Sequence, residues 1–313
     1  MRAILISLLL LAGSASADDG IRHIGPVTAI VANGSDIYSC SQAGVLKCAD
    51  STSQLTEIAV PSFRVTAIAM LGDQQLAMCG GLPGESGSIG VIELASGKWT
   101  AHEFTKDLIY AVAIAPSHEF LAAACADGNV LLFRLPLNTA TLPVVIHKHT
   151  AAARSLAFSP DGKFLLSGGL DGVMLMTPVE KSGSRAGETR SLQEHTSGIE
   201  CLAFSPDGKQ FASGARDSKV RLHAIDGRFI RTYAGIGIED EPAAERLATR
   251  IWAVAWRKDT LVAGTSKGTL YRLSLKDDTW FKRQRTGKGA IYSLAFSDDE
   301  SLWIGSDFIE LAR

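Results

Sequence analysis

The chain carries nearly the same eighteen residues twice. Residues 155–172 read SLAFSPDGKFLLSGGLDG, and residues 201–218, 46 positions later, read CLAFSPDGKQFASGARDS. A chain of 313 residues can hold two ordinary domains or one large domain built from repeated units. A period of this length is typical of repeat architectures, so the duplication favours the second alternative.

Five looser copies of the unit accompany this pair. Each copy opens with a short apolar strand, and the seven opening strands are residues 28–32, 66–70, 110–114, 154–158, 200–204, 252–256 and 292–296. A turn, a second strand, an Asp-Gly type of turn, a third strand and a more polar fourth strand follow. Turns such as Ser159-Pro160-Asp161-Gly162 have a physical cause, because proline fixes one dihedral angle and glycine accepts positive φ. Each unit is therefore predicted to be a four-stranded antiparallel meander.

The opening strands are apolar on both faces. Small residues such as Ala157 and Ala203 alternate with large ones such as Phe158 and Phe204. Both faces must be covered, which neighbouring units achieve when their sheets stack around a common axis. We therefore predict an all-β fold, a seven-bladed β-propeller of four-stranded antiparallel blades, over residues 18–313.

The last unit lacks a fourth strand. The sequence ends with the third strand of that unit, FIELAR at residues 308–313, whereas residues 21–24 precede the first unit and have no other partner. We expect the N-terminal strand, residues 21–24, to complete the last blade, which would leave no exposed edge at the seam.

Two units carry a further pattern of side chains. His195, Ser213 and Asp217 are spaced by 18 and 22 positions from the histidine, and the preceding unit repeats these spacings with His149, Ser167 and Asp171. In this the chain resembles the WD-repeat β-propeller family. The resemblance implies a structural brace, in which these three side chains join a tryptophan of the third strand. Here Met176 or His223 stands in place of that tryptophan, and the terminal Trp-Asp pair is absent.

The first seventeen residues differ from the rest. Arg2 is followed by an almost uninterrupted apolar run to Ala12, and Ala15-Ser16-Ala17 precedes Asp18. This pattern predicts a signal peptide over residues 1–17. A membrane anchor is the alternative, but the run is short for about 30 Å of hydrocarbon. We expect a secreted or periplasmic monomer with no membrane span after signal removal.

The charge balance bears on the type of partner, and the cysteine positions bear on whether disulfides stabilise the fold. The 31 basic and 33 acidic residues nearly balance, so we expect no nucleic-acid partner. Cys40, Cys79 and Cys125 fall in the column that holds Gly168 and its equivalents in other units, where cysteine acts as a small apolar residue. A Cys40–Cys48 bridge is an open alternative, although free thiols are expected.

Several motifs are candidate chemical sites. His147 and His149 have the spacing of metal ligands, but no third ligand is evident, so no metal is predicted. The glycines of residues 80–90 predict a flexible loop rather than a phosphate loop, because no helix follows. The basic cluster at Lys282, Arg283, Arg285 and Lys288 is interpreted as the solvent-exposed edge of an outer strand. No cofactor and no catalytic constellation are expected.

The residues that open the first strands line one mouth of the predicted channel. They are Thr28, Thr66, Tyr110, Arg154, Glu200, Trp252 and Tyr292. Binding surfaces favour tryptophan, tyrosine and arginine, so Tyr110, Arg154, Glu200, Trp252 and Tyr292 are the predicted partner-binding residues. The insertions at 80–88 and 234–250 are expected to flank this mouth.

Two functions of different class fit this mouth. The first is an extracytoplasmic interaction scaffold that binds a protein or peptide partner. The second is a propeller enzyme, such as a hydrolase, a lactonase or a quinone-dependent dehydrogenase. An enzyme should gather a base, a nucleophile or metal ligands at one point. The ring offers one carboxylate, Glu200, next to Arg154, and opposite charges pair, so binding is preferred.

Overall fold

The computed structural model describes most of the chain between residues 23 and 312. The described residues are 23, 25–49, 55–137, 142–180, 185–233, 249–276, 279–285, 289–298, 300–306 and 309–312. Within these ranges the regular structure is entirely β, with no helix. The described residues accordingly include no helix of the length and apolarity that a membrane crossing requires. The predicted signal peptide, residues 1–17, lies outside them.

The strands form antiparallel sheets in chain order. The first three sheets are β1 (Ala29–Asn33), β2 (Asp36–Ser41), β3 (Gly44–Ala49) and β4 (Leu55–Ala59); β5 (Val65–Leu71), β6 (Gln75–Leu82), β7 (Ser86–Glu93) and β8 (Trp99–Thr105); and β9 (Ile109–Ile114), β10 (Phe120–Cys125), β11 (Asn129–Arg134) and β12 (Val144–Lys148).

The next three sheets repeat this plan. They are β13 (Ala153–Phe158), β14 (Phe164–Gly169), β15 (Met174–Pro178) and β16 (Arg190–Leu192); β17 (Ile199–Phe204), β18 (Gln210–Ala215), β19 (Val220–Ala224) and β20 (Phe229–Tyr233); and β21 (Ile251–Arg257), β22 (Thr260–Thr265), β23 (Thr269–Ser274) and β24 (Thr279–Arg285). A last sheet holds β25 (Ser293–Phe296), β26 (Leu302–Gly305) and β27 (Ile309–Ala312).

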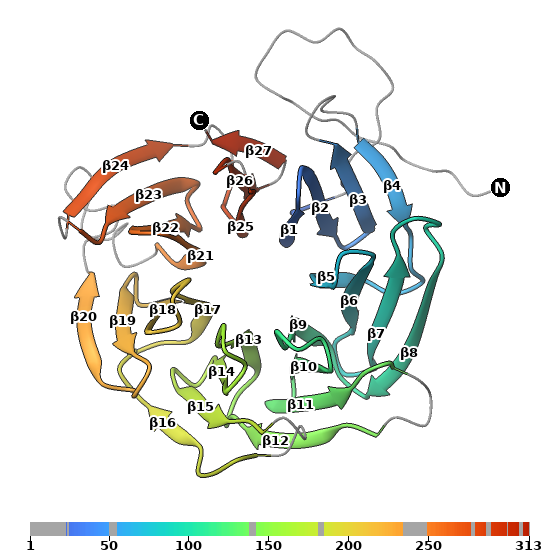
Figure 1. The fold of residues 1–313 in the computed structure, drawn as a ribbon, viewed down its shortest axis with the longest axis horizontal. Helices are drawn as coiled ribbons and strands as arrows, with labels where there is room; N and C mark the ends of the chain where they lie inside the picture. The colour runs from blue at the N-terminus through green and yellow to red at the C-terminus, as the bar shows by residue number, and fades with distance from the viewer. Residues whose placement is uncertain are drawn as a thin grey trace, which may run out of the picture.

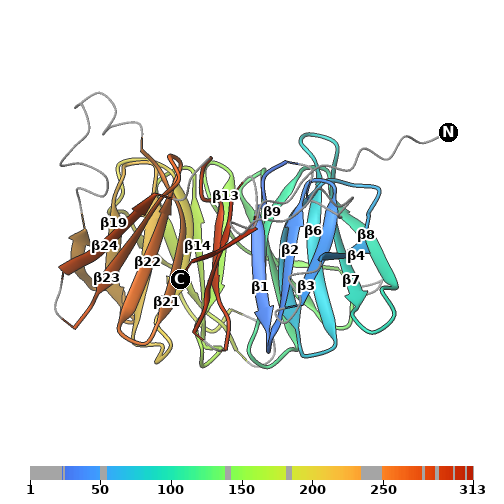
Figure 2. The same cartoon turned by 90° about the horizontal axis from the view of Figure 1, so that it is seen from above.

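These sheets stand around a central axis like the blades of a propeller. In Figure 1 the first strand of every sheet, from β1 to β25, lies innermost, and the last strand lies at the periphery. Figure 2 shows that the strands run between the two faces of the ring. The all-β propeller of four-stranded antiparallel blades is thus confirmed, and each predicted opening strand coincides with an observed strand to within one residue at its start.

The number of blades differs from the prediction. Six four-stranded blades are described rather than seven, and the sheet β25-β26-β27 has three strands. The strand expected to complete that sheet, residues 21–24, lies outside the described residues except for His23. Val27 nevertheless joins the two ends of the ring, because its N–H donates to Ser306 O at 2.8 Å and its carbonyl accepts from Ser293 Oγ at 3.1 Å.

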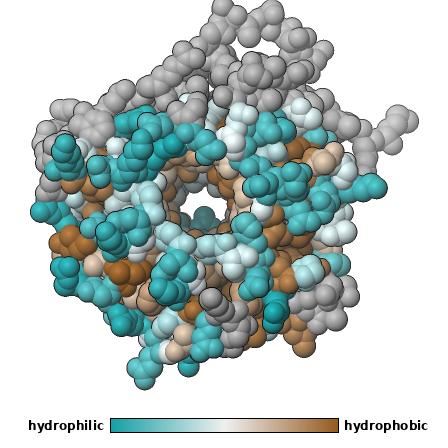
Figure 3. Space-filling view, viewed as in Figure 1, coloured by the Kyte–Doolittle hydropathy of each residue, from teal (hydrophilic) through white to brown (hydrophobic). Residues whose placement is uncertain are grey.

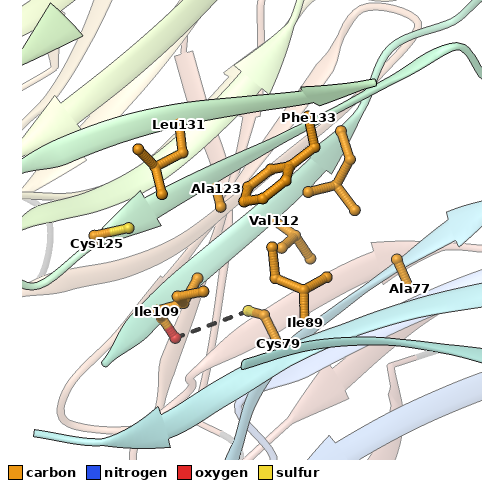
Figure 4. Close-up of a cluster of buried hydrophobic side chains, with 10 residues drawn as sticks. Ala77, Cys79, Ile89, Ile109, Val112, Ala123, Cys125, Leu131 and Phe133 are labelled. Atoms are coloured by element: carbon orange, nitrogen blue, oxygen red, sulfur yellow. Dashed lines mark hydrogen bonds between the residues drawn. The ribbon is translucent and has the colours of Figure 1, made fainter. Parts of the chain in front are cut away.

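The core lies between the blades. Figure 4 shows one such cluster, in which Ile89 and Cys79 from one blade pack against Val112, Leu131 and Phe133 from the next. All five side chains are buried. Because apolar area is removed from water only where two blades meet, each blade depends on its neighbours for stability.

The column shared by glycine and cysteine is present, with one correction. Cys40, Cys79, Gly168, Gly214, Gly264 and Gly305 occupy equivalent positions in the second strands, but the third blade places Ala124 there and Cys125 one residue later. Volume decides which residue fits. A Cβ on Gly214 would lie 2.6 Å from Cys201 Sγ, whereas Cys40 faces the smaller Ala29.

The cysteines act as apolar core residues. Cys40, Cys79, Cys125 and Cys201 are free thiols, so Cys40 forms no bridge to Cys48, whose side chain lies outside the described set. Burial raises the pKa of Cys40 and of Cys79 to about 12. Such thiols stay protonated and unreactive at neutral pH.

Residues 80–88 do not form the flexible loop that was predicted. Strands β6 and β7 remain paired out to Leu82 and Ser86, so this stretch is a long hairpin with a tight turn. Glycine makes the extension possible, since Gly84 adopts φ +71° in the turn and a Cβ on Gly81 would lie 2.0 Å from Ser86 O. The tip is tied to the next blade, because Gly84 N–H donates to Asp107 Oδ1 at 2.8 Å.

Candidate functional site

The propeller is hollow at its centre, as Figure 3 shows. A cavity of about 660 Å³ opens there, and all seven residues predicted to form the channel mouth line it: Thr28, Thr66, Tyr110, Arg154, Glu200, Trp252 and Tyr292. They come from the starts of the innermost strands or from the residue just before them. The ring geometry thus brings together side chains that are up to 264 positions apart in sequence (28 to 292).

Glu200 is the acidic centre of this mouth. Its carboxylate accepts a hydrogen bond from Arg154 Nε at 2.9 Å and one from Arg216 Nε at 2.5 Å, one on each oxygen. The Glu200 side chain is only 4% exposed. A buried carboxylate needs such compensation, and the pairing with Arg154 agrees with the expectation from sequence.

Aromatic rings flank the charged group. The guanidinium of Arg154 lies over the Tyr110 ring, 4.3 Å from its centroid, a geometry in which the ring quadrupole attracts the cation. On the other side of Glu200, Trp252 and Tyr292 stack with their centroids 4.9 Å apart and an interplanar angle of 25°. All three rings are half-buried, so each retains area that a partner can cover.

Two further arginines belong to the mouth and were not predicted from the sequence. Arg216 follows β18, and Arg64 precedes β5; both line the cavity. Neither arginine opens the first strand of a unit, and only residues that open these strands were predicted to line the mouth. The place of Arg216 at the mouth could have been predicted, because the end of the second strand lies beside the start of the first strand in an antiparallel pair.

The described residues that line the mouth carry a net positive charge. Arg64, Arg154 and Arg216 contribute three positive charges, and Glu200 is the single acidic residue among the described residues that line the cavity. The whole chain, by contrast, has a formal net charge of −2. The described lining residues therefore carry an excess of two positive charges, which the chain as a whole does not share.

The arrangement lacks the features of a general acid–base centre within the described part of the chain. There, both oxygens of Glu200 are held by guanidinium groups, and neither a histidine nor a second carboxylate lines the cavity. The same residues contain no group of three or more histidine, cysteine or acidic side chains placed to hold a metal ion. What the mouth offers is hydrogen-bond donors, positive charge and aromatic surface.

The predicted brace residues lie outside this mouth and contact one another. His149 Nε2 lies 2.7 Å from Ser167 Oγ, and its Nδ1 lies 3.2 Å from Asp171. In the next blade His195 is 2.8 Å from Ser213 and 3.1 Å from Asp217. Although burial raises the pKa of Asp217, hydrogen bonds from His195 and Arg221 outweigh it and hold that pKa well below its ordinary value.

Other side chains stand in for the tryptophan that the WD-repeat resemblance implied. The serine of the fourth blade is reached not by Met176 but by His147 of β12, the outer strand of the third blade. The Nε2 atom of His147 lies 2.7 Å from Ser167 Oγ, and its Nδ1 atom lies 2.7 Å from Thr177 Oγ1. This contact gives His147 a structural role in place of the metal-ligand alternative. Burial lowers the pKa of His147 to about 3, which keeps the imidazole neutral.

The fifth blade uses a different substitute. Arg221 lies against His195 and donates a hydrogen bond to Asp217 at 2.8 Å. His223 occupies the position of the implied tryptophan, is fully buried, and stacks on Phe211 with ring centroids 5.1 Å apart. Neither ring nitrogen of His223 has a hydrogen-bond partner among the described residues.

A histidine that contacts the serine of the first blade was also not predicted from the sequence. His23 Nε2 lies 2.7 Å from Ser39 Oγ, and His23 precedes Thr28 by five positions, as His149 precedes Arg154. The separation from histidine to serine is 16 positions here and 18 in the fourth and fifth blades. The shorter turn between β1 and β2 accounts for the difference, so a search for fixed spacing could not detect it.

Comparison with known proteins agrees with this geometry. Residues 95–134, 141–176 and 187–223 match the model of the WD domain, G-beta repeat. A stretch of 61 residues is 43% identical to centriole proteome protein 16 from Chlamydomonas reinhardtii; it is 20% of this chain and 3% of that protein. The chain therefore corresponds to only a small part of that relative.

Fold and site together define a β-propeller with a lined central mouth. Three matched repeats and the ring of four-stranded blades support, more narrowly, a WD-repeat β-propeller family. Such repeats suggest a protein-interaction scaffold, and propellers of this kind are typically non-catalytic.

Proposed function

We propose that this protein is an extracytoplasmic interaction scaffold that binds a protein or peptide partner at the channel mouth. The observation that carries the proposal is the composition of the mouth. Stacked Trp252 and Tyr292 lie beside the Arg154–Glu200–Arg216 cluster on a rigid ring of strands. Aromatic and arginine side chains supply most of the binding energy at protein interfaces.

The alternative, a propeller enzyme with its centre in the same mouth, has less support. Catalysis by a carboxylate requires a proton acceptor or nucleophile that can reach a substrate. Glu200 is nearly buried and its oxygens are occupied by two arginines. Binding is the function that this arrangement serves with the side chains as they stand.

Export is supported by the sequence of residues 1–17. We propose a secreted or periplasmic protein that begins at Asp18 after cleavage and acts as a monomer. N-terminal sequencing of the protein recovered from the periplasm or culture medium tests this. A start at Asp18 is expected, and recovery of the uncleaved chain from the cytoplasm would contradict it.

We further propose that the three-stranded sheet is a seventh blade and that residues 21–24 provide its fourth strand. Support comes from the position of the sheet between the β21 blade and β1. The hydrogen bonds of Val27 to Ser306 and Ser293 also bring the N-terminal segment to this sheet. Closure by both ends of the chain would protect the seam.

Capture experiments test the binding function. Tagged residues 18–313 are incubated with envelope extract and medium of the producing organism, and bound proteins are compared between the unaltered chain and Trp252→Ala/Tyr292→Ala. Loss of an aromatic pair at the centre of an interface should reduce capture by about tenfold or more. Val144→Ala/Val145→Ala, on exposed positions of the outer strand β12, is the matched control. Equal capture by both double variants would refute binding at the mouth.

A further inference from the structure

We propose that the channel mouth recognises a carboxylate, so that the partner presents an acidic peptide segment to Arg154 and Arg216. This inference rests on the proposed function and names the chemistry of its partner. The supporting observation is that one buried carboxylate holds two arginines through Nε, while their Nη donors have no hydrogen-bond partner among the described residues.

Glu200 fixes the two guanidinium groups. Each of its oxygens accepts from the Nε of one arginine, at 2.9 Å for Arg154 and 2.5 Å for Arg216. The carboxylate is almost completely buried, and Arg154 is further held against the Tyr110 ring. Two long side chains that are mobile in most proteins are thus ordered before any ligand arrives, which lowers the entropy lost on binding.

The outer edges of both guanidinium groups have no hydrogen-bond partner among the described residues. Only Nε is used in the contacts to Glu200, and within the described part of the chain neither arginine makes a hydrogen bond through Nη. Their side chains are 37% and 33% exposed and line the cavity. The planar pair of Nη donors matches the two oxygens of a carboxylate.

The charge balance of the described lining residues also favours an anion. One negative charge on Glu200 cannot neutralise Arg154 and Arg216 together, and Arg64 adds a third positive charge to the same cavity. A carboxylate entering the mouth would reduce this excess in a partly desolvated site, where ion pairs are stronger than at an open surface.

The neighbouring aromatic stack favours a peptide over a small free anion. Trp252 and Tyr292 belong to the two blades that follow the blade of Glu200, and they stack at 4.9 Å. A cavity of about 660 Å³ has room for more than a single carboxylate. An acidic residue with an apolar neighbour would contact both the arginines and the rings, whereas a small anion would contact only the arginines.

Peptide pools test the inference directly. Two fluorescein-labelled, end-capped pools, Ala-X-Glu-Glu-X-Ala and Ala-X-Gln-Gln-X-Ala with X drawn from Phe, Tyr, Leu and Val, are titrated with residues 18–313, and fluorescence anisotropy is measured. The Glu pool should bind about tenfold tighter or more, and this preference should shrink as salt is raised. Equal affinity of the two pools, or no binding of either up to about 1 mM, would overturn the inference.

Variants locate the preference. Arg154→Lys/Arg216→Lys keeps both charges beside Glu200 but removes the planar donors, so the preference for the Glu pool should fall to less than about threefold. Arg64 makes no contact with Glu200, so Arg64→Gln provides a second test if the lysine double variant fails to fold. It should weaken binding of the Glu pool several-fold. Lys282→Gln/Arg283→Gln removes two charges from the outer strand β24 and should change neither the affinity for the Glu pool nor its preference over the Gln pool. A preference that survives the lysine variant, or that falls in the β24 control, would overturn the assignment.

Two further outcomes show whether the carboxylate specificity or the binding site itself is wrong. A pool with phosphoserine in place of both glutamates that binds more tightly than the Glu pool would contradict the carboxylate assignment in favour of phosphate. If Trp252→Ala/Tyr292→Ala releases a captured protein while the pools are not distinguished, the mouth is a binding site and only the acidic specificity is wrong.

Discussion

The Nε2 atom of His147 lies 2.7 Å from Ser167 Oγ, on the hydroxyl that also contacts His149 Nε2 at 2.7 Å. One serine hydroxyl therefore contacts two histidines at the seam between the third and fourth blades, the buried His149 and the half-buried His147. In the fifth blade the equivalent Ser213 contacts a single histidine, His195. The two blades thus form a natural matched pair for measuring what the shared hydroxyl contributes.

Replacing each serine by alanine should separate the two braces. Ser167→Ala leaves two imidazole nitrogens without a partner, and Ser213→Ala leaves one. Because each buried polar group that loses its partner costs about 1–3 kcal/mol, Ser167→Ala should be the more destabilising by about that amount. Urea unfolding of both variants measures the difference, and an equal or larger loss in Ser213→Ala would contradict the shared role of Ser167.

His223→Phe should stabilise the protein. The imidazole is fully buried, both its nitrogens lack a partner within the described residues, and its ring lies parallel to Phe211 at 9°. Phenylalanine keeps the stacking and removes two buried polar atoms, so a gain of about 1 kcal/mol in the free energy of unfolding is expected. Thermal unfolding checks the sign. A clear loss would mean that the imidazole nitrogens have a structural role.

Buried neutral histidines make stability depend on pH. Burial lowers the pKa of His23 and His223 to about 4 and that of His147 to about 3, whereas an unfolded histidine titrates near 6.5. Their contribution is therefore complete above pH 6.5 and is lost as the pH falls toward 4, because only the unfolded state takes up protons in that interval.

Each of these histidines adds at most about 1.4 kcal/mol per pH unit to the slope. Urea unfolding at pH 7.5, 5.5 and 4.5 measures it, and His223→Phe should show a shallower decline than the unaltered chain. Stability that rises between pH 6.5 and 4.5 would contradict the assignment of these groups as neutral.

Much of the fold and the candidate site could be predicted from sequence, for identifiable reasons. Apolar strands with Pro-Asp-Gly turns define the repeat, and the ring then places Thr28 beside Tyr292 at the mouth. Arg64 and Arg216 were missed because they flank strands rather than open them. His23 was missed because a shorter hairpin changes its spacing to Ser39. Such contacts depend on local turn length, which a strict period does not encode.

The hairpin at residues 80–88 shows another limit. Its glycines predicted a flexible loop, but in the structure they allow strands β6 and β7 to approach closely. Similarly, Cys125 was placed one position from its true register because alanines precede it in β10. Small residues specify close packing, and their sequence alone does not reveal which neighbour they approach.

Removal of residues 18–24 tests closure of the ring. If this segment completes the three-stranded sheet, deletion uncovers the edge of β27 and removes the contact of His23 with Ser39. The midpoint of thermal unfolding should fall by several degrees, as a loss of about 1–2 kcal/mol predicts for a domain of this size. The shortened chain should also associate at high concentration, as exposed edge strands do.

His23→Ala is the control that separates the two effects. It should lose the brace without exposing an edge, so its unfolding midpoint should fall less and it should remain monomeric in sedimentation. A deletion that behaves like His23→Ala in both measurements would contradict closure by residues 21–24.

Photocrosslinking tests most directly whether the channel mouth is the binding surface. A p-benzoylphenylalanine residue replaces Tyr292 at the mouth or, as control, the exposed Val145 on the outer strand β12, and each protein is irradiated in extract that contains the captured partner. A covalent adduct is predicted from position 292 and none from position 145. Crosslinking from position 145 but not from position 292 would contradict the account.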